Sequence, residues 1–316
     1  MKILLVEYAV AVGNKEFLKE GKVMLKIIVK SFSNLGHEVY YLSNNLTLKY
    51  GIKIQSNENN FEHIIESYAK LVDAGLVIAP DELLFKLTTI IEKNTINLGS
   101  HSNSIKMCVD KLLCTKILNS NEILTPKILQ QKLNNGKYVI KPQFGCGSDG
   151  VYMCDTFELK DGFITTEYIE GEHISVSLIC GNNPLPLTIN KQKIEFDNFN
   201  INYNGNVVPF KTECDKKIYD IAIKVANILK CKGYIGIDMI LNNNKKISKT
   251  HTHSKNMHNE KIYVIDVNPR PTTALFGISK VMKEEIGDLL LKNLNDTLPN
   301  SVELIGTHSF TKKDII

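Results

Sequence analysis

Strand-sized apolar runs alternate with helix-sized amphipathic segments through about the first hundred residues of the chain. Lys2 to Tyr8 is a short apolar run, and the apolar residues of Glu20 to Phe32 recur at helical spacing. Two further helical patterns, Phe61 to Leu71 and Asp81 to Glu92, each lie next to another apolar run. This alternation is typical of a parallel sheet covered by helices on both faces. We therefore expect an open parallel α/β domain over residues 1–103.

The pattern changes after residue 105. Strand-sized segments now follow one another, from Lys137 to Lys141 as far as Lys261 to Val267, and one long helical pattern, Asp215 to Lys230, interrupts them. Successive strands without helices between them favour antiparallel pairing, so we expect an α+β unit. The Asn- and His-rich stretch 242–260 is expected to be a hairpin loop. Its histidines (His251, His253 and His258) could bind a metal, although a solvated insertion is the favoured interpretation.

Charge and hydropathy exclude several classes of function. The 316 residues carry a formal net charge of +4, which permits an anionic ligand such as a nucleotide but gives no dense basic face for nucleic acid. The longest apolar runs, such as Ile3 to Val6, are far too short to span a bilayer, and the first residues lack a signal-peptide pattern. Seven scattered cysteines without a C-x-x-C pair are typical of reduced thiols. We expect a cytoplasmic protein that binds neither membrane nor nucleic acid.

A glycine-rich turn follows the strand-like segment that ends in Lys141. Its residues Gly145, Gly147 and Gly150 let backbone N–H groups approach phosphate oxygens closely, and the lysine supplies a positive charge. The turn also matches G-x-G-x-x-G, but a dinucleotide site needs a helix next, and Val151 to Cys154 is strand-like. This disfavours a nicotinamide-dependent oxidoreductase and favours a flap over ATP phosphates. A hairpin turn with a surface lysine is the plain alternative.

Three oxygen-bearing side chains stand in apolar segments towards the end of the chain. Asp238 lies inside a strand-like run, and Asp266 and Asn268 are two residues apart, so the latter two share one face of a strand. A carboxylate in apolar surroundings is rarely left unpaired, which indicates either a metal or an ion pair with Lys or Arg. Oxygen ligands of this kind suit hard cations such as Mg²⁺ or Mn²⁺. The residues alone leave both interpretations open.

The order of these segments resembles the ATP-grasp superfamily. The matching segments are Asp110-Lys111 with Thr115-Lys116, the Lys141 glycine loop, Glu167 to Glu172, Asp238, and Asp266-x-Asn268-Pro-Arg270. Together they cover about residues 102–280. The resemblance implies an ATP-grasp fold with an N-terminal open parallel α/β domain at 1–103. A central lid subdomain would follow at 104–170, and a C-terminal subdomain with the metal site at 171–316.

The resemblance also assigns residues to ATP and to two divalent ions. The lysines would contact phosphates and the glycine loop would cover them, while the acidic segment would hold adenine and ribose. The residues assigned to ATP are Lys111, Lys141, Gly145, Gly147, Ser148, Gly150, Glu167, Ile169 and Glu172. Asp238, Asp266 and Asn268 are assigned to two Mg²⁺ or Mn²⁺ ions, and Arg270 and Lys141 are the implied catalytic residues.

Shorter matches narrow the resemblance to the archaeal tyramine–L-glutamate ligase family of methanofuran biosynthesis. They are Val6-Glu7-Tyr8-Ala9, Glu20-Gly21, Ile78-Ala79-Pro80-Asp81 and Asn268 to Thr273. They imply an ATP-dependent ligase that joins the γ-carboxylate of L-glutamate to tyramine through an acyl phosphate. Glu7 and Tyr8 stand at the carboxyl end of a strand, where Glu7 could pair with the ammonium and Tyr8 could pack on the phenol ring. A strand-end Glu and a core Tyr are the plain alternatives. A ligase for another amino acid and amine, and a non-catalytic ATP-binding module, are the alternatives. The expected partners are small-molecule substrates, and a homodimer stays open.

Overall fold

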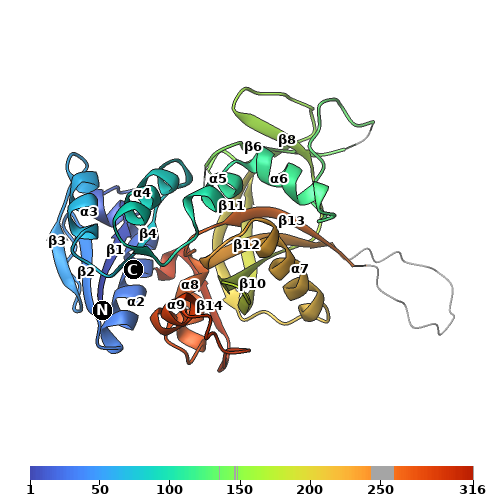
Figure 1. Cartoon of the computed structure of the whole chain (residues 1–316). Helices are drawn as coiled ribbons and strands as arrows, with labels where there is room; N and C mark the ends of the chain where they lie inside the picture. The colour runs from blue at the N-terminus through green and yellow to red at the C-terminus, as the bar shows by residue number, and fades with distance from the viewer. Residues whose placement is uncertain (135, 146, 148, 243–259, 316) are drawn as a thin grey trace.

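The computed structural model describes residues 1–134, 136–145, 147, 149–242 and 260–315, and its first sheet has five parallel strands (Figure 1). The strand order is β3-β2-β1-β4-β5. The strands are β1 (Lys2–Glu7), β2 (Glu38–Ser43), β3 (Ile52–Gln55), β4 (Ala74–Ile78) and β5 (Ile96–Asn97). Each neighbouring pair is parallel, which confirms the prediction for the first part of the chain.

Helices cover both faces of this first sheet. On one face, α2 (Leu18–Asn34) shares a core with α8 (Ala274–Val281) and α9 (Ile286–Leu294). On the other face lie α3 (Phe61–Ala69), α4 (Asp81–Asn94) and α5 (Ser102–Val109), while the short α1 (Tyr8–Val12) follows β1 directly. One core therefore joins the beginning of the chain to helices near its end.

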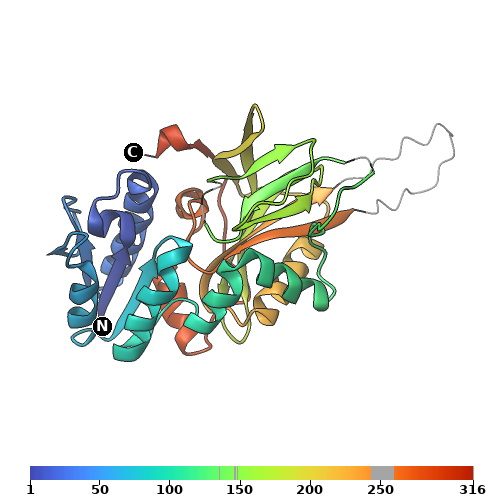
Figure 2. The ribbon, with the colours of Figure 1, turned by 90° about the horizontal axis from the view of Figure 1, so that it is seen from above.

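The second sheet has nine strands in mainly antiparallel order, as predicted for the α+β part (Figure 2). Its order is β13-β12-β9-β10-β11-β7-β6-β8, and β14 pairs with β11. The strands are β6 (Tyr138–Pro142), β7 (Tyr152–Cys154), β8 (Phe163–Glu167), β9 (Glu172–Cys180), β10 (Leu185–Asp197), β11 (Asn200–Val208), β12 (Gly233–Asn242), β13 (Lys261–Asn268) and β14 (His308–Thr311). The helices α6 (Lys111–Ser120) and α7 (Asp215–Ile228) pack against it, and a 3-10 turn, η1 (Lys312–Asp314), follows β14.

Among the described residues, six elements have no counterpart in the sequence prediction: α1, β3, α5, β11, β14 and η1. In β11, asparagines alternate with Ile201, Tyr203 and Val207, which is a strand-like pattern, but the sequence analysis assigned no element there. It forms a strand because β10 and β14 pair with its two edges. Asn242 pairs with Lys261, so the strands that flank the predicted loop are joined. The loop itself, residues 243–259 with its three histidines, lies outside the described residues.

Candidate active site

A cavity lies between the two sheets, and residues from both line it. The first sheet contributes Glu7, which ends β1, and Ile78, which ends β4 and is its register partner. At β1 and β4 the chain switches from one side of the sheet to the other, which is where open α/β sheets bind ligands. The second sheet contributes side chains from β6 and from β8 to β13. The cavity is thus assembled from distant parts of the chain.

The three side chains predicted to bind metal come together on β12 and β13. Asp238 and Asp266 are register partners, and a register shift follows directly after Asp238. The amide nitrogen of Asn268 donates to Asp238 Oδ2 over 3.2 Å. All three residues line the cavity. Their proximity is a property of the structure, whereas their role as metal ligands stays a prediction.

The electrostatics of this cluster suit a divalent cation. Burial, and then the charge of Asp266, raises the pKa of Asp238 to about 7. Gln192 Nε2 donates to Asp238 Oδ1 over 2.9 Å, so neighbouring amides hold both oxygens. A cation between the carboxylates would relieve their repulsion, and Asn268 could offer it the amide oxygen. The described residues contain no group of three or more His, Cys, Asp or Glu placed to hold a metal. The donor set is therefore two carboxylates and one amide, which fits Mg²⁺ or Mn²⁺ supplemented by phosphate oxygens.

Asp81 links two cationic side chains to this cluster. Its carboxylate lies 3.5 Å from Lys111 Nζ and 3.3 Å from Arg270 Nη2. Lys111 Nζ is also 3.9 Å from Asp266 Oδ2. Burial raises the pKa of Asp81, and the two cations oppose that rise. The ion-pair interpretation of Asp266 therefore finds a partner in Lys111, although Asp81 lies closer to that lysine.

Lys141 approaches the same region from β6. Its Nζ donates to the backbone carbonyl of Ile265 over 2.7 Å, directly beside Asp266. Burial lowers the pKa of Lys141, and the charge of Asp266 opposes this shift. Together with Lys111 and Arg270, Lys141 makes a positive surface next to the carboxylates, which is the arrangement a metal–polyphosphate needs.

The glycine loop is tied to the start of α6. Lys111 Nζ donates to the carbonyl of Gly145 over 2.5 Å. Gly145 and Gly147 line the cavity with φ values of 136° and 72°, which a side chain would disfavour. Gly150 also has a positive φ but does not line the cavity, and Ser148 lies outside the described residues. Because the strand β7 follows the loop, the dinucleotide-binding interpretation is wrong.

The predicted adenine and ribose residues divide into two groups. Glu167 and Ile169 line the cavity, and the backbone N–H of Lys127 donates to Glu167 Oε1 over 3.0 Å. Glu172 does not line the cavity, because its carboxylate forms an ion pair with Lys191 over 2.6 Å. The structure therefore brings Glu167 and Ile169 to the cavity and turns Glu172 towards another partner.

Glu7 is buried at the first-sheet side of the cavity. Its Oε2 accepts from the backbone N–H of Val10 over 2.8 Å, which caps α1. Burial raises the pKa of Glu7 to about 7, against backbone hydrogen bonds and the charge of Arg270. Gly21 packs directly on the carboxylate, where any side chain would collide. Tyr8 does not line the cavity, since its ring packs edge-on against Phe61 with centroids 5.7 Å apart, so its predicted packing on a ligand ring is wrong.

Several residues at the site were not predicted as site residues. Asp81 pairs with two lining residues, Lys111 and Arg270, and five others line the cavity themselves: Gln192, Tyr203, Asn206, Glu20 and Lys312. For Asp81 a signal existed, because an acidic residue directly after a parallel strand is positioned at the ligand edge of the sheet. For the others no local signal existed. They reach the cavity through strand pairing and through the return of the C-terminal segment to α2.

Comparison with known proteins agrees with this geometry. Residues 108–274 match the model of the ATP-grasp domain family. The chain belongs to the ATP-grasp family. The tyramine–L-glutamate ligases of Methanocaldococcus jannaschii and Methanocaldococcus fervens are each 33% identical to it over 93% of this chain and over 89% and 94% of their own. A solved structure of an ATP-grasp superfamily protein from Archaeoglobus fulgidus has a TM-score of 0.77 at 27% identity and covers 97% of this chain and 91% of that one.

ATP-grasp ligases use ATP and divalent metal ions, and the cavity of this ATP-grasp protein offers groups for both. Lys111, Lys141 and Arg270 supply positive charge, and Asp238 and Asp266 supply carboxylates. Within the part of the chain that the structure describes, no helix has the length and apolar character needed to cross a membrane.

Proposed function

We propose that this ATP-grasp protein is a ligase that joins the γ-carboxylate of L-glutamate to the amine of tyramine. The observation that carries the proposal is the position of the Asp238–Asp266 pair, which lies beside Lys111, Lys141 and Arg270 in a cavity that Glu7 also lines. The tyramine–L-glutamate ligases that match nearly the whole chain support the substrate pair. A non-catalytic ATP-binding module would have less need of such a cluster.

The proposed reaction has two steps. A γ-carboxylate oxygen of glutamate takes the γ-phosphoryl group of ATP, and ADP leaves. The amine nitrogen then attacks the acyl carbon, phosphate leaves with the C–O bonding pair, and the ammonium proton is lost. When bound, one or two divalent ions would neutralise charge on the phosphates, held by Asp238, Asp266 and Asn268. Mg²⁺ or Mn²⁺ is the proposed metal.

The cations of the site would act on the phosphoryl group and on the acyl oxygen. Lys141 and Lys111 bring two ammonium groups to the carboxylates that would hold the metal. The guanidinium of Arg270 can donate two parallel hydrogen bonds to an acyl phosphate. Because phosphoryl transfer needs little covalent help, positioning and charge neutralisation by these groups would provide most of the acceleration.

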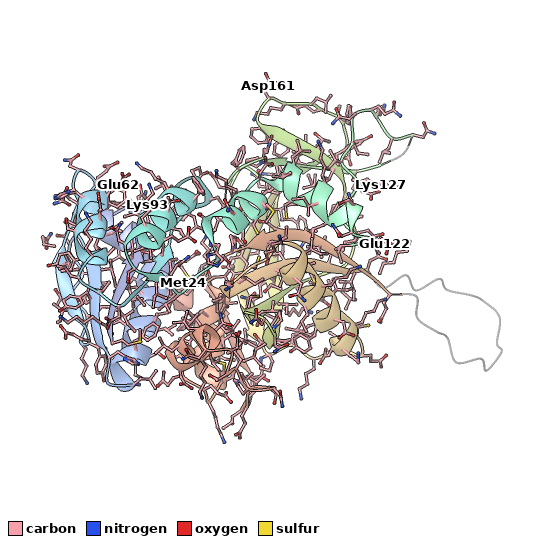
Figure 3. The ribbon with its side chains drawn as sticks, viewed as in Figure 1. Met24, Glu62, Lys93, Glu122, Lys127 and Asp161 are labelled. Atoms are coloured by element: carbon pink, nitrogen blue, oxygen red, sulfur yellow. The ribbon has the colours of Figure 1, made fainter. Side chains whose placement is uncertain are left out.

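Glu7 is the proposed site for the tyramine ammonium. Its carboxylate lies within reach of the charge of Arg270, so an amine bound there would lie near the acyl group. A carboxyl whose pKa is about 7 is better matched to accept the ammonium proton than an ordinary one. Ile78, the register partner of Glu7, lines the same cavity as the apolar side chains of Phe17 and Met24, and these three would cover the phenyl ring (Figure 3, where Met24 is labelled).

The test combines two assays with ATP, metal and L-glutamate. With tyramine, mass spectrometry should detect γ-glutamyltyramine together with equal amounts of ADP and phosphate. With hydroxylamine instead, the acyl phosphate should be trapped as the γ-hydroxamate. Asp266→Asn should lose both products. Asp161→Asn, at an exposed carboxylate that does not line the cavity (labelled in Figure 3), should keep both. If the hydroxamate forms but γ-glutamyltyramine does not, tyramine is not the amine substrate. If another carboxylate and amine are coupled far faster than L-glutamate and tyramine, the proposed substrate pair is wrong.

The division of the chain at residues 103 and 170 also stays a proposal. The change from a parallel to an antiparallel sheet supports the boundary at 103, whereas strands on both sides of residue 170 belong to one sheet. Limited proteolysis should cut near these boundaries before it cuts inside either sheet. Early cleavage within β9 to β12 would contradict this division.

A further inference from the structure

The cavity extends beyond the metal-binding residues to a polar corner, which we define as Glu20, Tyr203, Asn206 and Lys312. All four line the cavity, and none is assigned to ATP or metal above. Tyr203 and Asn206 belong to β11, Glu20 to α2, and Lys312 to the turn after β14. Figure 2 shows the end of the chain beside the N-terminal part, which is how Lys312 meets Glu20.

Asn206 presents a buried acceptor without a donor. The residue is 1% exposed, and its amide nitrogen donates to the Tyr203 hydroxyl over 2.9 Å. Its Oδ1 has no hydrogen-bond partner among the described residues. Buried polar atoms are nearly always satisfied, so a carbonyl oxygen of this kind at a cavity wall indicates a ligand that brings a donor.

Opposite charges complete the corner. Lys312 Nζ lies 3.2 Å from Glu20 Oε1, and Thr273 Oγ1 donates to the other carboxylate oxygen over 3.2 Å. Lys312 Nζ is also 5.7 Å from the ring centre of Tyr203. A carboxylate and an ammonium side by side, next to an unsatisfied acceptor, are complementary to the ammonium and carboxylate of an amino acid.

The corner lies next to the groups that would handle phosphate. Asn206 is the register partner of Gln192, and the Gln192 amide donates to Asp238 over 2.9 Å. Thr273, which holds Glu20, follows Arg270 on the same short segment. A compact substrate could therefore touch the corner with one end and the metal-binding carboxylates with the other.

We propose that the polar corner binds the α-amino-acid end of the carboxylate substrate. Glu20 and Asn206 Oδ1 accept hydrogen bonds from the α-ammonium, and Lys312 pairs with the α-carboxylate. The side-chain carboxylate then points to Asp238 and Arg270, where it is phosphorylated. This inference rests on the proposed ligase activity and adds a substrate-selecting site to it.

Hydroxylamine trapping tests the corner without involving tyramine. Three carboxylates are compared with ATP and metal: L-glutamate, glutarate, which lacks the α-ammonium, and 4-aminobutyrate, which lacks the α-carboxylate. The wild-type protein should prefer glutamate to each analogue by roughly 10- to 100-fold in kcat/KM, the range expected for one charged hydrogen-bonded contact.

The variants remove one contact each. Glu20→Gln should lower kcat/KM for glutamate and 4-aminobutyrate by roughly 10- to 100-fold but leave glutarate nearly unchanged. Lys312→Met should instead leave kcat/KM for 4-aminobutyrate nearly unchanged and lower kcat/KM for L-glutamate and glutarate. Asn206→Leu, like Glu20→Gln, should lower kcat/KM for L-glutamate and 4-aminobutyrate more than kcat/KM for glutarate. Glu16→Gln and Lys313→Met, at exposed neighbours that do not line the cavity, are the matched controls and should change nothing.

The outcomes separate the two levels of the proposal. If no carboxylate gives hydroxamate with the wild type, the ligase assignment fails. If glutamate reacts but each corner variant affects all three carboxylates equally, the ligase stands and the corner assignment is wrong. The corner assignment is also wrong if Glu20→Gln raises the KM for tyramine but leaves the preference for L-glutamate over its analogues unchanged. Glu20 would then bind the amine substrate.

Discussion

Two walls of the cavity hold their charges in different ways. The phosphate wall, which comprises Lys111, Lys141, Asp238, Asp266, Asn268 and Arg270, sets cations and carboxylates within a few ångströms of one another. The amine wall, comprising Glu7, Gly21 and Met24, places a buried carboxylate among apolar neighbours. On the phosphate wall, ion pairs position Lys111 and Arg270, and hydrogen bonds from neutral groups hold Asp238 and Lys141. On the amine wall, the backbone of α1 and the absence of a side chain at Gly21 hold Glu7. Loss of one charge on the phosphate wall should therefore strongly lower kcat, whereas loss of the charge on the amine wall should mainly lower kcat/KM for the amine.

The largest effect should come from Lys141→Ala. Removing this ammonium takes away one of the positive charges proposed to neutralise the transferred phosphoryl group, and kcat should fall by about 100- to 1000-fold. The fold should persist, because Lys141 Nζ bonds a single backbone carbonyl in the structure and belongs to no apolar core. Lys137→Ala, at an exposed lysine just before the same strand, is the control. Full turnover in folded Lys141→Ala would remove this lysine from the catalytic site.

A second test uses the stability of the metal-free protein. The pKa of Asp238 is raised from 3.8 to about 7, so the folded state keeps a proton that the unfolded state releases. The stability from this group is therefore present below about pH 4 and is lost as pH rises to about 7. Asp238→Asn avoids that loss, and its advantage in the free energy of unfolding should grow by as much as about 4 kcal/mol between pH 4 and 8.

Urea unfolding in EDTA measures this difference, and Glu7, which has a similar shift, contributes equally to both proteins. The same variant should lose its metal-dependent activity. An unfolding free energy that differs by a constant amount at every pH would mean that Asp238 has an ordinary pKa and that the carboxylates do not repel each other.

The amine wall should give a smaller and more selective effect. Glu7→Gln keeps the shape of the side chain but cannot pair with an ammonium as a charge, so kcat/KM for tyramine should fall roughly 10- to 100-fold. Hydroxamate formation with hydroxylamine should be nearly normal. Gly21→Ala should act similarly, because the new methyl group would displace the Glu7 carboxylate. Equal losses in both assays would place Glu7 in carboxylate activation instead.

Wild-type protein should also use tyrosine less well than tyramine as the amine substrate, since the carboxylate of tyrosine would lie beside the carboxylate of Glu7.

The smallest effect is expected outside both walls. Replacing residues 243–259 by a short glycine-containing turn should change turnover less than about twofold, because β12 and β13 already pair as far as Asn242 and Lys261 and loop closure depends weakly on length. Turnover and metal requirement should be compared with the full chain. A folded protein with lost activity would show that the segment, including its histidines, serves the site.

Much of the fold could be predicted because its signals are local. Apolar residues at helical or strand spacing mark α2, α4 and β1, since each of these elements buries one face in a core. The elements that escaped prediction, such as β3 and β11, are short or polar and depend on pairing with neighbours. Their stability comes from contacts that no single segment encodes.

The candidate site divides along the same line. The sequence alone determined that Asp266 and Asn268 share a face, because alternate residues of a strand do, and that Lys141 precedes a turn able to approach phosphate. Only the tertiary structure decided that Asp238 lies opposite Asp266, that Asp81 joins Lys111 to Arg270, and that Glu172 turns to Lys191. It also decided that Lys312 reaches Glu20 across nearly the whole chain. Side-chain periodicity is set by neighbouring residues. The contacts between distant residues depend instead on strand order and on which helices share a core.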